Sequence, residues 1–296
     1  MSNDIVIDLS HVSKHFGKHA ALEDVTYQVR RGSVFALLGE NGAGKTTTIR
    51  ILLGLCEPDS GSRSVLGLDS KRNDLQIRQS VGYVPEQPIL YDWMTADEIG
   101  RFSASFYPEG YLNCYRQWLE KYDLRPEAKI RTLSKGQRAK VSLSVALAHD
   151  PELLILDEPT SGLDAMVRRE FLESMVDRAA TGRTVFLSSH QISEVERVAD
   201  TVAIMKKSKM LLIEPLDSLK SRTRSVTVTF DGDIPVWIGT PLMSQIIEQR
   251  VDGRELRILG HDLREDSERL LKEHPNVARY EIRTPSLEEI FMSYMK

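Results

Sequence analysis

Residues 34–46 read VFALLGENGAGKT, and this stretch decides the fold. Its first five residues are all apolar and do not alternate with polar ones, which predicts a central strand covered on both faces. Its last eight residues satisfy the pattern GxxxxGK[ST], and helix-like residues 47–55 follow directly. A strand, a glycine-rich loop and a helix in this order predict a phosphate site, because the loop turns backbone N–H groups inward and the helix N-terminus adds positive potential.

We expect every residue of this loop to contact a bound nucleotide, together with the first residue of the following helix. These residues are Gly39, Glu40, Asn41, Gly42, Ala43, Gly44, Lys45, Thr46 and Thr47. Lys45 is expected to reach the β- and γ-phosphates and to act in catalysis, and Thr46 is expected to ligate Mg²⁺.

Other strand-like segments recur along the chain, with helix-like segments between them. They are residues 5–9, 81–84, 153–156, 185–188 and 201–205. The run LLIL at 153–156 is again apolar without alternation, as expected for a strand buried on both faces. This rhythm predicts an α/β fold with a mixed, largely parallel sheet.

Length and composition predict two domains. The chain has 296 residues, whereas one domain usually has roughly 150. We expect residues 1–220 to form the large domain, with a helical lobe at about 93–148, and residues 221–296 to form a small α+β domain. Within the small domain we expect strands at 225–230, 256–259 and 278–282, and helices at 264–272 and 286–295.

The run at 153–156 ends in Asp157 and Glu158. Because the carboxyl ends of parallel strands meet at one edge of a sheet, we expect these carboxylates beside the phosphate loop. Asp157 is expected to hold Mg²⁺, directly or through water, and Glu158 to be the general base that polarises the attacking water. An isolated Asp-Glu pair after a strand would more often be a solvated turn.

Charge and composition argue against several classes of protein. With 39 Lys and Arg against 43 Asp and Glu, the formal charge is −4, so we expect no nucleic-acid partner. The two cysteines are far apart and suggest neither a disulfide framework nor a zinc site. The N-terminus does not resemble a secretory signal, and no stretch approaches the ~18 apolar residues of a membrane span. We expect a cytoplasmic protein.

Residues 133–137 read LSKGQ and resemble the signature motif of ATP-binding-cassette (ABC) ATPases, usually LSGGQ, which a helix follows in that family as it does here. The resemblance implies a P-loop NTPase cassette that hydrolyses ATP with Mg²⁺. It also implies that Ser134, Gly136 and Gln137 cap the γ-phosphate bound by an opposite subunit, so that activity requires a dimer of cassettes, expected to be a homodimer. Alone, Ser134 would be read as an ordinary helix N-cap.

Further residues match the family pattern one by one. Residues 161–164 read SGLD and resemble the D-loop, which places Asp164 at the contact between the two sites. His190 follows the strand at 185–188 and resembles the switch histidine that contacts the γ-phosphate in catalysis. Phe16 is similar in position to the aromatic residue that stacks on adenine, although by itself it would more often belong to a core.

Three positions depart from the family pattern. Glu86 stands where the family has glutamine after a Tyr-Val-Pro strand end, and Gln87 follows it, so either side chain could face Mg²⁺; we favour Glu86 slightly because a carboxylate is a hard, charged ligand. Lys135 replaces the first glycine of the signature motif. Gly162 replaces the alanine of the D-loop.

The resemblance implies a function in transport. We expect a nucleotide-binding subunit that energises a separate transmembrane permease and is membrane-associated only through it, on the cytoplasmic face. Residues 285–291, PSLEEIF, are similar to the ending of subunits paired with exporters, which favours export, although a plain amphipathic helix fits equally well. Residues 88–95 are expected to receive the permease through Tyr91 and Trp93, unless these aromatics pack locally.

Two other functions compete with transport. One is a soluble ABC ATPase that acts on nucleic acid or ribosomes, which would usually carry two cassettes, coiled coils or zinc insertions. The other is a non-catalytic scaffold, which is disfavoured because the expected active residues are all present.

Overall fold

The computed structural model describes residues 4–232 and 242–296 of the chain. The chain forms two compact units, Met1–Ile213 and Glu214–Lys296. The expected boundary between residues 220 and 221 lies within helix α8 (Leu216–Arg222) and stays a prediction.

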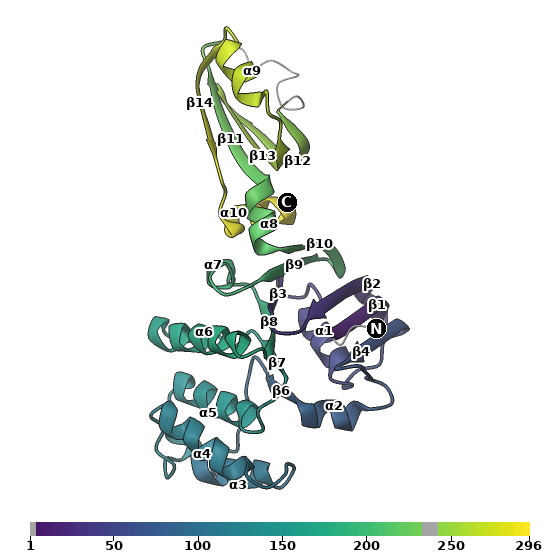
Figure 1. The fold of residues 1–296 in the computed structure, drawn as a ribbon, viewed down its shortest axis with the longest axis vertical. Coiled ribbons are helices and arrows are strands. Elements are labelled where there is room, and N and C mark those ends of the chain that lie inside the picture. Colours follow the sequence, from purple (N-terminus) through teal and green to yellow (C-terminus); the bar gives the residue numbers. More distant parts are fainter. Residues whose placement is uncertain (1–3, 233–241) are drawn as a thin grey trace. The chain divides into compact units, whose positions relative to one another are not determined.

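A six-stranded sheet forms the centre of the first unit (Figure 1). Its strands lie in the order β10 (Lys209–Pro215), β9 (Thr201–Lys206), β3 (Val34–Gly39), β8 (Thr184–Ser189), β7 (Leu153–Asp157) and β6 (Val81–Val84). All pairs from β9 to β6 are parallel, and every residue of β3, β7 and β8 is buried. The expected α/β fold with a largely parallel sheet is confirmed, and the carboxyl ends of these strands meet at one edge.

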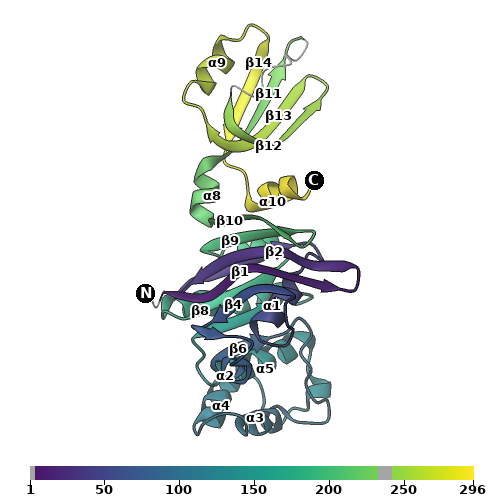
Figure 2. The same ribbon diagram turned by 90° about the vertical axis from the view of Figure 1, so that its right-hand side faces the viewer.

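A second, antiparallel sheet packs near the first and was not predicted as a separate sheet; the strand expected at residues 5–9 belongs to it and not to the parallel sheet. The strands of this second sheet lie in the order β2 (His19–Arg30), β1 (Ile5–Phe16), β4 (Ser60–Val65) and β5 (Leu68–Asp69). Figure 2 shows β1 and β2 side by side along their full length. Helix α1 (Lys45–Leu52) contacts both sheets, whereas α6 (Ala165–Ala180) lies on the opposite face of the parallel sheet in Figure 1.

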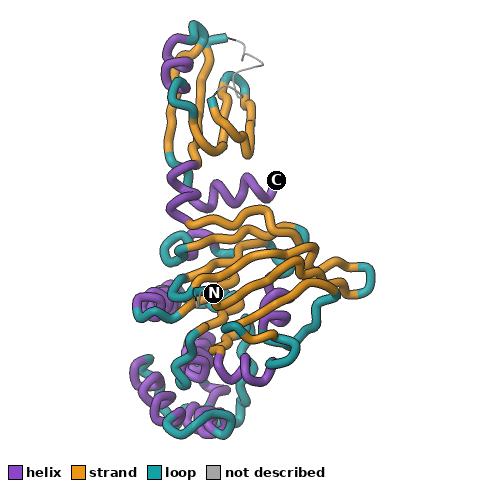
Figure 3. The backbone as a smooth tube through the Cα atoms, turned by 45° about the vertical axis from the view of Figure 1, so that its right-hand side comes forward, coloured by secondary structure: helices purple, strands orange, loops and turns teal. Residues whose placement is uncertain are grey.

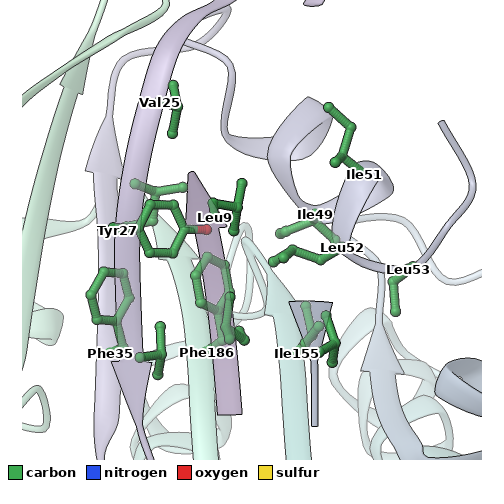
Figure 4. Packing of buried hydrophobic residues seen from close by; sticks show 14 of the residues in the cluster. Leu9, Val25, Tyr27, Phe35, Ile49, Ile51, Leu52, Leu53, Ile155 and Phe186 are labelled. Atoms are coloured by element: carbon green, nitrogen blue, oxygen red, sulfur yellow. The ribbon is translucent and has the colours of Figure 1, made fainter. Parts of the chain in front are cut away.

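Three stacked aromatic rings join the two sheets in the core. The ring centroids of Tyr27 and Phe35 are 5.3 Å apart, and those of Phe35 and Phe186 are 5.6 Å apart. Figure 4 shows these rings beside Ile49 and Leu52 of α1. Because stacked aromatics bury large apolar areas, this core fixes where the loop between β3 and α1 lies.

The expected helical lobe is present within the first unit. It contains α3 (Ala96–Ala104), α4 (Tyr111–Lys121), a short 3-10 helix η1 (Ile130–Thr132) and α5 (Lys135–Leu147). Two further short helices, α2 (Asp74–Ser80) and α7 (Ile192–Val195), lie outside it. The side chain of Tyr115 is fully buried, and its hydroxyl donates a hydrogen bond of 2.7 Å to the carbonyl of Ala96, which fixes α4 against α3.

The second unit is built on an antiparallel sheet in the order β12 (Met243–Asp252), β13 (Glu255–Leu263), β11 (Thr223–Phe230) and β14 (Val277–Arg283). The expected strands at 225–230, 256–259 and 278–282 lie in this sheet, whereas β12 was not predicted. Helices α9 (Ser267–Glu273) and α10 (Leu287–Met295) correspond to the two expected helices, and α9 begins three residues later than expected. Figure 3 shows these strands in orange. In the described parts of the chain, no helix is long and apolar enough to span a bilayer.

Candidate nucleotide-binding and catalytic site

The glycine-rich loop connects β3 to α1 in the conformation that its glycines allow. Gly42 and Gly44 have φ angles of 80° and 114°, in the left-handed region that glycine tolerates best. A Cβ added to Gly44 would lie 2.5 Å from the carbonyl oxygen of Ala21. Helix α1 begins at Lys45 without a side-chain cap, so its first N–H groups have no partner within the helix and are available to an anion.

Lys45 lies buried at this loop, with only 6% of its side chain exposed. Its ammonium group donates hydrogen bonds of 2.6 Å to the carbonyl oxygen of Gly39 and 3.2 Å to that of Glu40. The same nitrogen lies 3.1 Å from Oε1 of Glu158, whose side chain is 7% exposed. The loop and the end of β7 therefore meet through one buried ion pair.

Glu158 also contacts His190 at the end of β8. Nδ1 of His190 lies 2.7 Å from Oε2 of Glu158, and the backbone N–H of His190 donates to the same oxygen at 3.2 Å. Glu158 has a φ angle of 48°, which is uncommon for a residue other than glycine and is typical of strained functional positions. The carboxylate expected to be the general base is thus held from two sides by the two other residues expected to act in catalysis.

Asp157 is fixed by a residue that sequence analysis missed. The hydroxyl of Ser188 donates a hydrogen bond of 2.6 Å to Oδ1 of Asp157 and accepts one of 3.1 Å from the backbone N–H of Glu158. All three residues are buried. Strands at 185–188 and 153–156 were both expected, but their pairing was not, and it is this parallel pairing that places Ser188 opposite Asp157.

Half of the residues expected to contact nucleotide line one cavity of about 320 Å³, whereas Gly39, Glu40 and Ala43 of the glycine-rich loop do not. The cavity is lined by Phe16, His19, Ala21, Asn41, Gly42, Gly44, Lys45, Thr46, Thr47, Glu86 and Glu158. Sequence analysis missed His19 and Ala21 of β2. Gln87 lines a neighbouring cavity instead, so Glu86 is the member of that pair that faces the glycine-rich loop.

An aromatic residue lies at each of two edges of this region. Phe16 is 52% exposed, and the ammonium group of Lys14 lies 5.4 Å from the centre of its ring, so the ring is accessible rather than part of the core. Tyr83 of β6 lies near Asp157. Burial, and then the negative charge of Asp157, raises the pKa of Tyr83 to about 12.

The residues of the signature motif lie outside this cavity. Ser134 caps α5: its hydroxyl accepts a hydrogen bond of 3.2 Å from the backbone N–H of Gln137, whose side chain accepts one of 2.9 Å from the backbone N–H of Ser134. Gly136 is buried, and a Cβ there would lie 3.0 Å from Val167. Both readings of Ser134 therefore stay open, because an N-cap can still present its hydroxyl to solvent.

Asp164 likewise caps a helix. Its Oδ1 accepts hydrogen bonds from the backbone N–H groups of Met166 and Val167 at the start of α6, at 3.1 Å and 3.0 Å. The cap explains why an aspartate stands at this position without reference to a second subunit. Its expected role between two sites stays a prediction.

The side chains at the cavity suit a hard divalent cation only in part. Thr46 and Glu86 provide oxygen ligands of the kind that Mg²⁺ prefers, and Asp157 adds a carboxylate at the adjacent strand end. In the described ranges, no group of three or more His, Cys, Asp or Glu side chains could hold a metal ion. This set therefore fits an ion that takes part of its coordination from phosphate and water.

Comparisons with known proteins agree with this geometry. The family model described as ABC transporter matches residues 22–161. The bacitracin transport ATP-binding protein BcrA of Bacillus licheniformis is 36% identical over 223 residues, covering 74% of this chain and 72% of that protein. This chain belongs to the ABC transporter family.

The relationship extends beyond the cassette in other relatives. The linearmycin resistance ATP-binding protein LnrL of Bacillus subtilis (strain 168) is 29% identical over 303 residues, covering 97% of both chains. A solved ATP-binding subunit of an ABC transporter has a TM-score of 0.68 and 32% identity, and the match covers 73% of this chain and 92% of that one. The chain is thus the ATP-binding subunit of an ABC transporter and an ABC ATPase, which confirms the family, the fold and the ATPase activity that the motifs indicated.

Proposed function

We propose that two copies of this subunit close around two ATP molecules and that hydrolysis reopens them, driving a separate permease from the cytoplasmic face of the membrane. The observation that carries the proposal is the buried contact of Lys45 with Glu158, which His190 also contacts, beside an uncapped helix N-terminus. Ser134 and the rest of the signature motif lie outside this cavity, which leaves them available to the nucleotide of a second copy.

Each residue has a chemical task in this proposal. The ammonium group of Lys45 exchanges Glu158 for the terminal phosphates, which stabilises charge as it develops there. Glu158, released from Lys45 but still held by His190, accepts a proton from the attacking water. Ser188 keeps Asp157 and the backbone of Glu158 in register, so that base and metal ligand stay adjacent.

Thr46, Glu86 and Asp157 are the residues proposed to hold Mg²⁺. The ion, bound together with ATP, neutralises charge on the β- and γ-phosphates. Because these side chains come from α1, the loop after β6 and β7, they bring three elements to one point. Phe16, exposed at the edge of the cavity, is proposed to stack on the adenine.

The permease is proposed to dock on exposed aromatic side chains at residues 88–106. Tyr91, Trp93, Phe102 and Phe106 are 46%, 65%, 45% and 61% exposed. Their rings touch in sequence, with centroids 6.0 Å apart for Tyr91 and Trp93, 5.6 Å for Tyr91 and Phe102, and 5.6 Å for Phe102 and Phe106. The rings pack against one another, as expected for local packing. They also form a continuous exposed aromatic surface, which is typical of a protein interface.

Export is the proposed direction of transport. The support is the tail at residues 285–291 and the names of two relatives, one of which acts in bacitracin transport and the other in linearmycin resistance. In the structure, Ser286 caps α10 through a reciprocal hydrogen bond with Glu289, so this tail segment is also a well-formed helix start in its own right.

Purification from membranes tests this function. We expect affinity-purified protein to carry a multi-span membrane protein, and we expect Trp93→Glu to lose that partner while it keeps its basal ATP hydrolysis. Recovery of ribosomes or RNA in place of a membrane protein would support the non-transport alternative and reject the proposal.

A further inference from the structure

The three positions at which the chain departs from the family pattern lie together. Glu86 and Lys135 line the same cavity of about 180 Å³, which also contacts Ser161 next to Gly162. Gly162 has a φ angle of 67°, and a Cβ added to it would collide with the ammonium group of Lys135. The ammonium group of Lys135 therefore lies directly beside Gly162.

Glu86 also lines the nucleotide cavity, and it is thereby shared by two neighbouring cavities. It is exposed near the start of the connection between β6 and α3, so its carboxylate can turn toward either cavity. On one side lies the glycine-rich loop that receives phosphates. On the other side lies Lys135.

Lys135 is placed where a cation is unfavourable without an anionic neighbour. It is the first residue of α5, and a positive charge opposes the positive end of a helix dipole. The next cation on this wall, Arg138, already pairs with Asp92 at 2.7 Å. Among residues 4–232 and 242–296, no carboxylate forms an ion pair with Lys135, which leaves Glu86 as the acidic side chain that shares its cavity.

We infer that Lys135 is a positioning residue that attracts Glu86 away from the phosphates and so couples the nucleotide cavity to the start of the signature helix. The negative charge of Glu86 opposes binding of a triphosphate when no metal ion separates them. Lys135 relieves that repulsion by drawing the carboxylate into the neighbouring cavity. Glu86 and Lys135 thus place two opposite charges where the family pattern has two uncharged residues.

Only one part of this inference rests on the proposed function, namely the effect of Lys135 on the signature motif. Ser134, which precedes Lys135, is proposed to serve the nucleotide of a second copy. A movement of Glu86 on ATP binding would then reach the signature motif of the same copy through Lys135. The attraction itself acts within one copy and can be measured without a dimer.

A double-mutant cycle tests the attraction. The affinity for a fluorescent ATP analogue is measured in EDTA at low protein concentration, which excludes hydrolysis, metal binding by Glu86 and pairing of copies. Lys135→Gly is expected to weaken binding about fivefold in the parent chain and less than about twofold in a Glu86→Gln background. Lys135→Arg is expected to keep the parent affinity, and the coupling is expected to shrink at about 0.5 M salt because exposed charges are screened.

Arg138→Ala is the matched control, because it removes a cation from the same cavity whose charge Asp92 already satisfies. Its effect on affinity is expected to be the same with Glu86 and with Glu86→Gln. Equal effects of Lys135→Gly in both backgrounds, or no effect in the parent chain, would overturn the inference. Because both positions are exposed, thermal unfolding of each variant shows whether the fold is intact. If ATP does not make two copies associate, the proposed function is refuted. The coupling between Lys135 and Glu86 can still be measured, because it acts within one copy.

Discussion

The two units of the chain each contain a polar cavity, and the cavities differ in how exposed their charged side chains are. The cavity of the second unit, on one face of its sheet, is the larger, about 480 Å³ against about 320 Å³. Its charges form exposed or half-exposed ion pairs: Arg257 with Glu255, Arg283 with Glu289, and Lys296 with Glu248.

In the first unit the charges are few and almost fully buried. Lys45 and Glu158 are 6% and 7% exposed, and they lie beside helix N–H groups that have no partner within the helix. A buried pair is costly to form, whereas exposed pairs contribute little. The nucleotide site is therefore identified by the buried charged side chains that line its cavity, and not by the volume of the cavity.

The largest effect is expected from removing the buried cation. Lys45→Ala should lower kcat for ATP hydrolysis by about 100-fold or more, because electrostatic stabilisation of the transferred phosphoryl group is lost. Lys296→Ala, which removes a cation from the cavity of the second unit, should leave kcat unchanged. A steady-state phosphate-release assay measures both. Equal losses in the two variants would erase the distinction between the cavities.

A smaller effect is expected where glycine is needed for space. Gly44→Ala should lower the free energy of unfolding by about 3 kcal/mol, because left-handed strain and a clash with the carbonyl of Ala21 add. Gly253→Ala, between β12 and β13, has a similar left-handed φ of 58° but open space around it, so it should lose only about 1 kcal/mol. Urea denaturation followed by fluorescence measures the free energy of unfolding of both variants. Equal losses would show that the clash with Ala21 is relieved at no cost.

The hydrogen bonds of Ser188 are expected to contribute less. Ser188→Ala removes the hydroxyl that donates to the buried carboxylate of Asp157, whereas the N–H of Glu158 can still donate to the backbone carbonyl of Ser188. The lost hydrogen bond should cost about 2 kcal/mol of stability and lower kcat. Ser225→Ala, on the face of the second sheet that lines its cavity, should change stability by less than about 0.5 kcal/mol. Thermal melting of the two variants measures both changes. If the Ser188 variant is as stable as the Ser225 variant, Ser188 does not stabilise the site.

The smallest effect concerns pH. Burial, and then the charge of Arg178, lowers the pKa of His149 in the first unit to about 4. Because the pKa of an unfolded histidine is about 6.5, this residue contributes stability above about pH 6.5 that is lost as the pH falls toward 4.

Burial also lowers the pKa of His261 in the second unit, so both units are expected to lose stability in acid. His149→Phe keeps a ring against Tyr107, whose centroid lies 4.5 Å from that of His149. Its Tm should fall less than that of the parent chain between pH 7 and pH 5. Parallel curves for the two proteins would show that His149 does not titrate with unfolding.

The sequence predicted the parts of the fold that depend on local pattern. Continuous apolar runs identified β3 and β7, because a strand buried on both faces needs no polar residue. The motif at residues 39–46 predicted the phosphate loop, because the backbone conformation of such a loop requires glycines. Strand β12 was missed because its residues, MSQIIEQRVD, show no clean alternation.

What was missed in the site depends on tertiary contacts. Ser188 matters because parallel register places it opposite Asp157, and His19 and Ala21 matter because the antiparallel sheet brings β2 to the glycine-rich loop. None of the three belongs to a motif. The relation between Glu86, Lys135 and Gly162 was also hidden, because the three were separate departures until the fold placed them at one cavity.

The central claim is that the nucleotide held by one copy is completed by the signature motif of another. Light scattering on Glu158→Gln under saturating Mg²⁺ and ATP tests it most directly, because this variant keeps the cavity but removes the proposed base. The expected mass is twice that of one chain, and it should return to that of one chain when Ser134→Arg is added. A single-chain mass for Glu158→Gln under these conditions would contradict it.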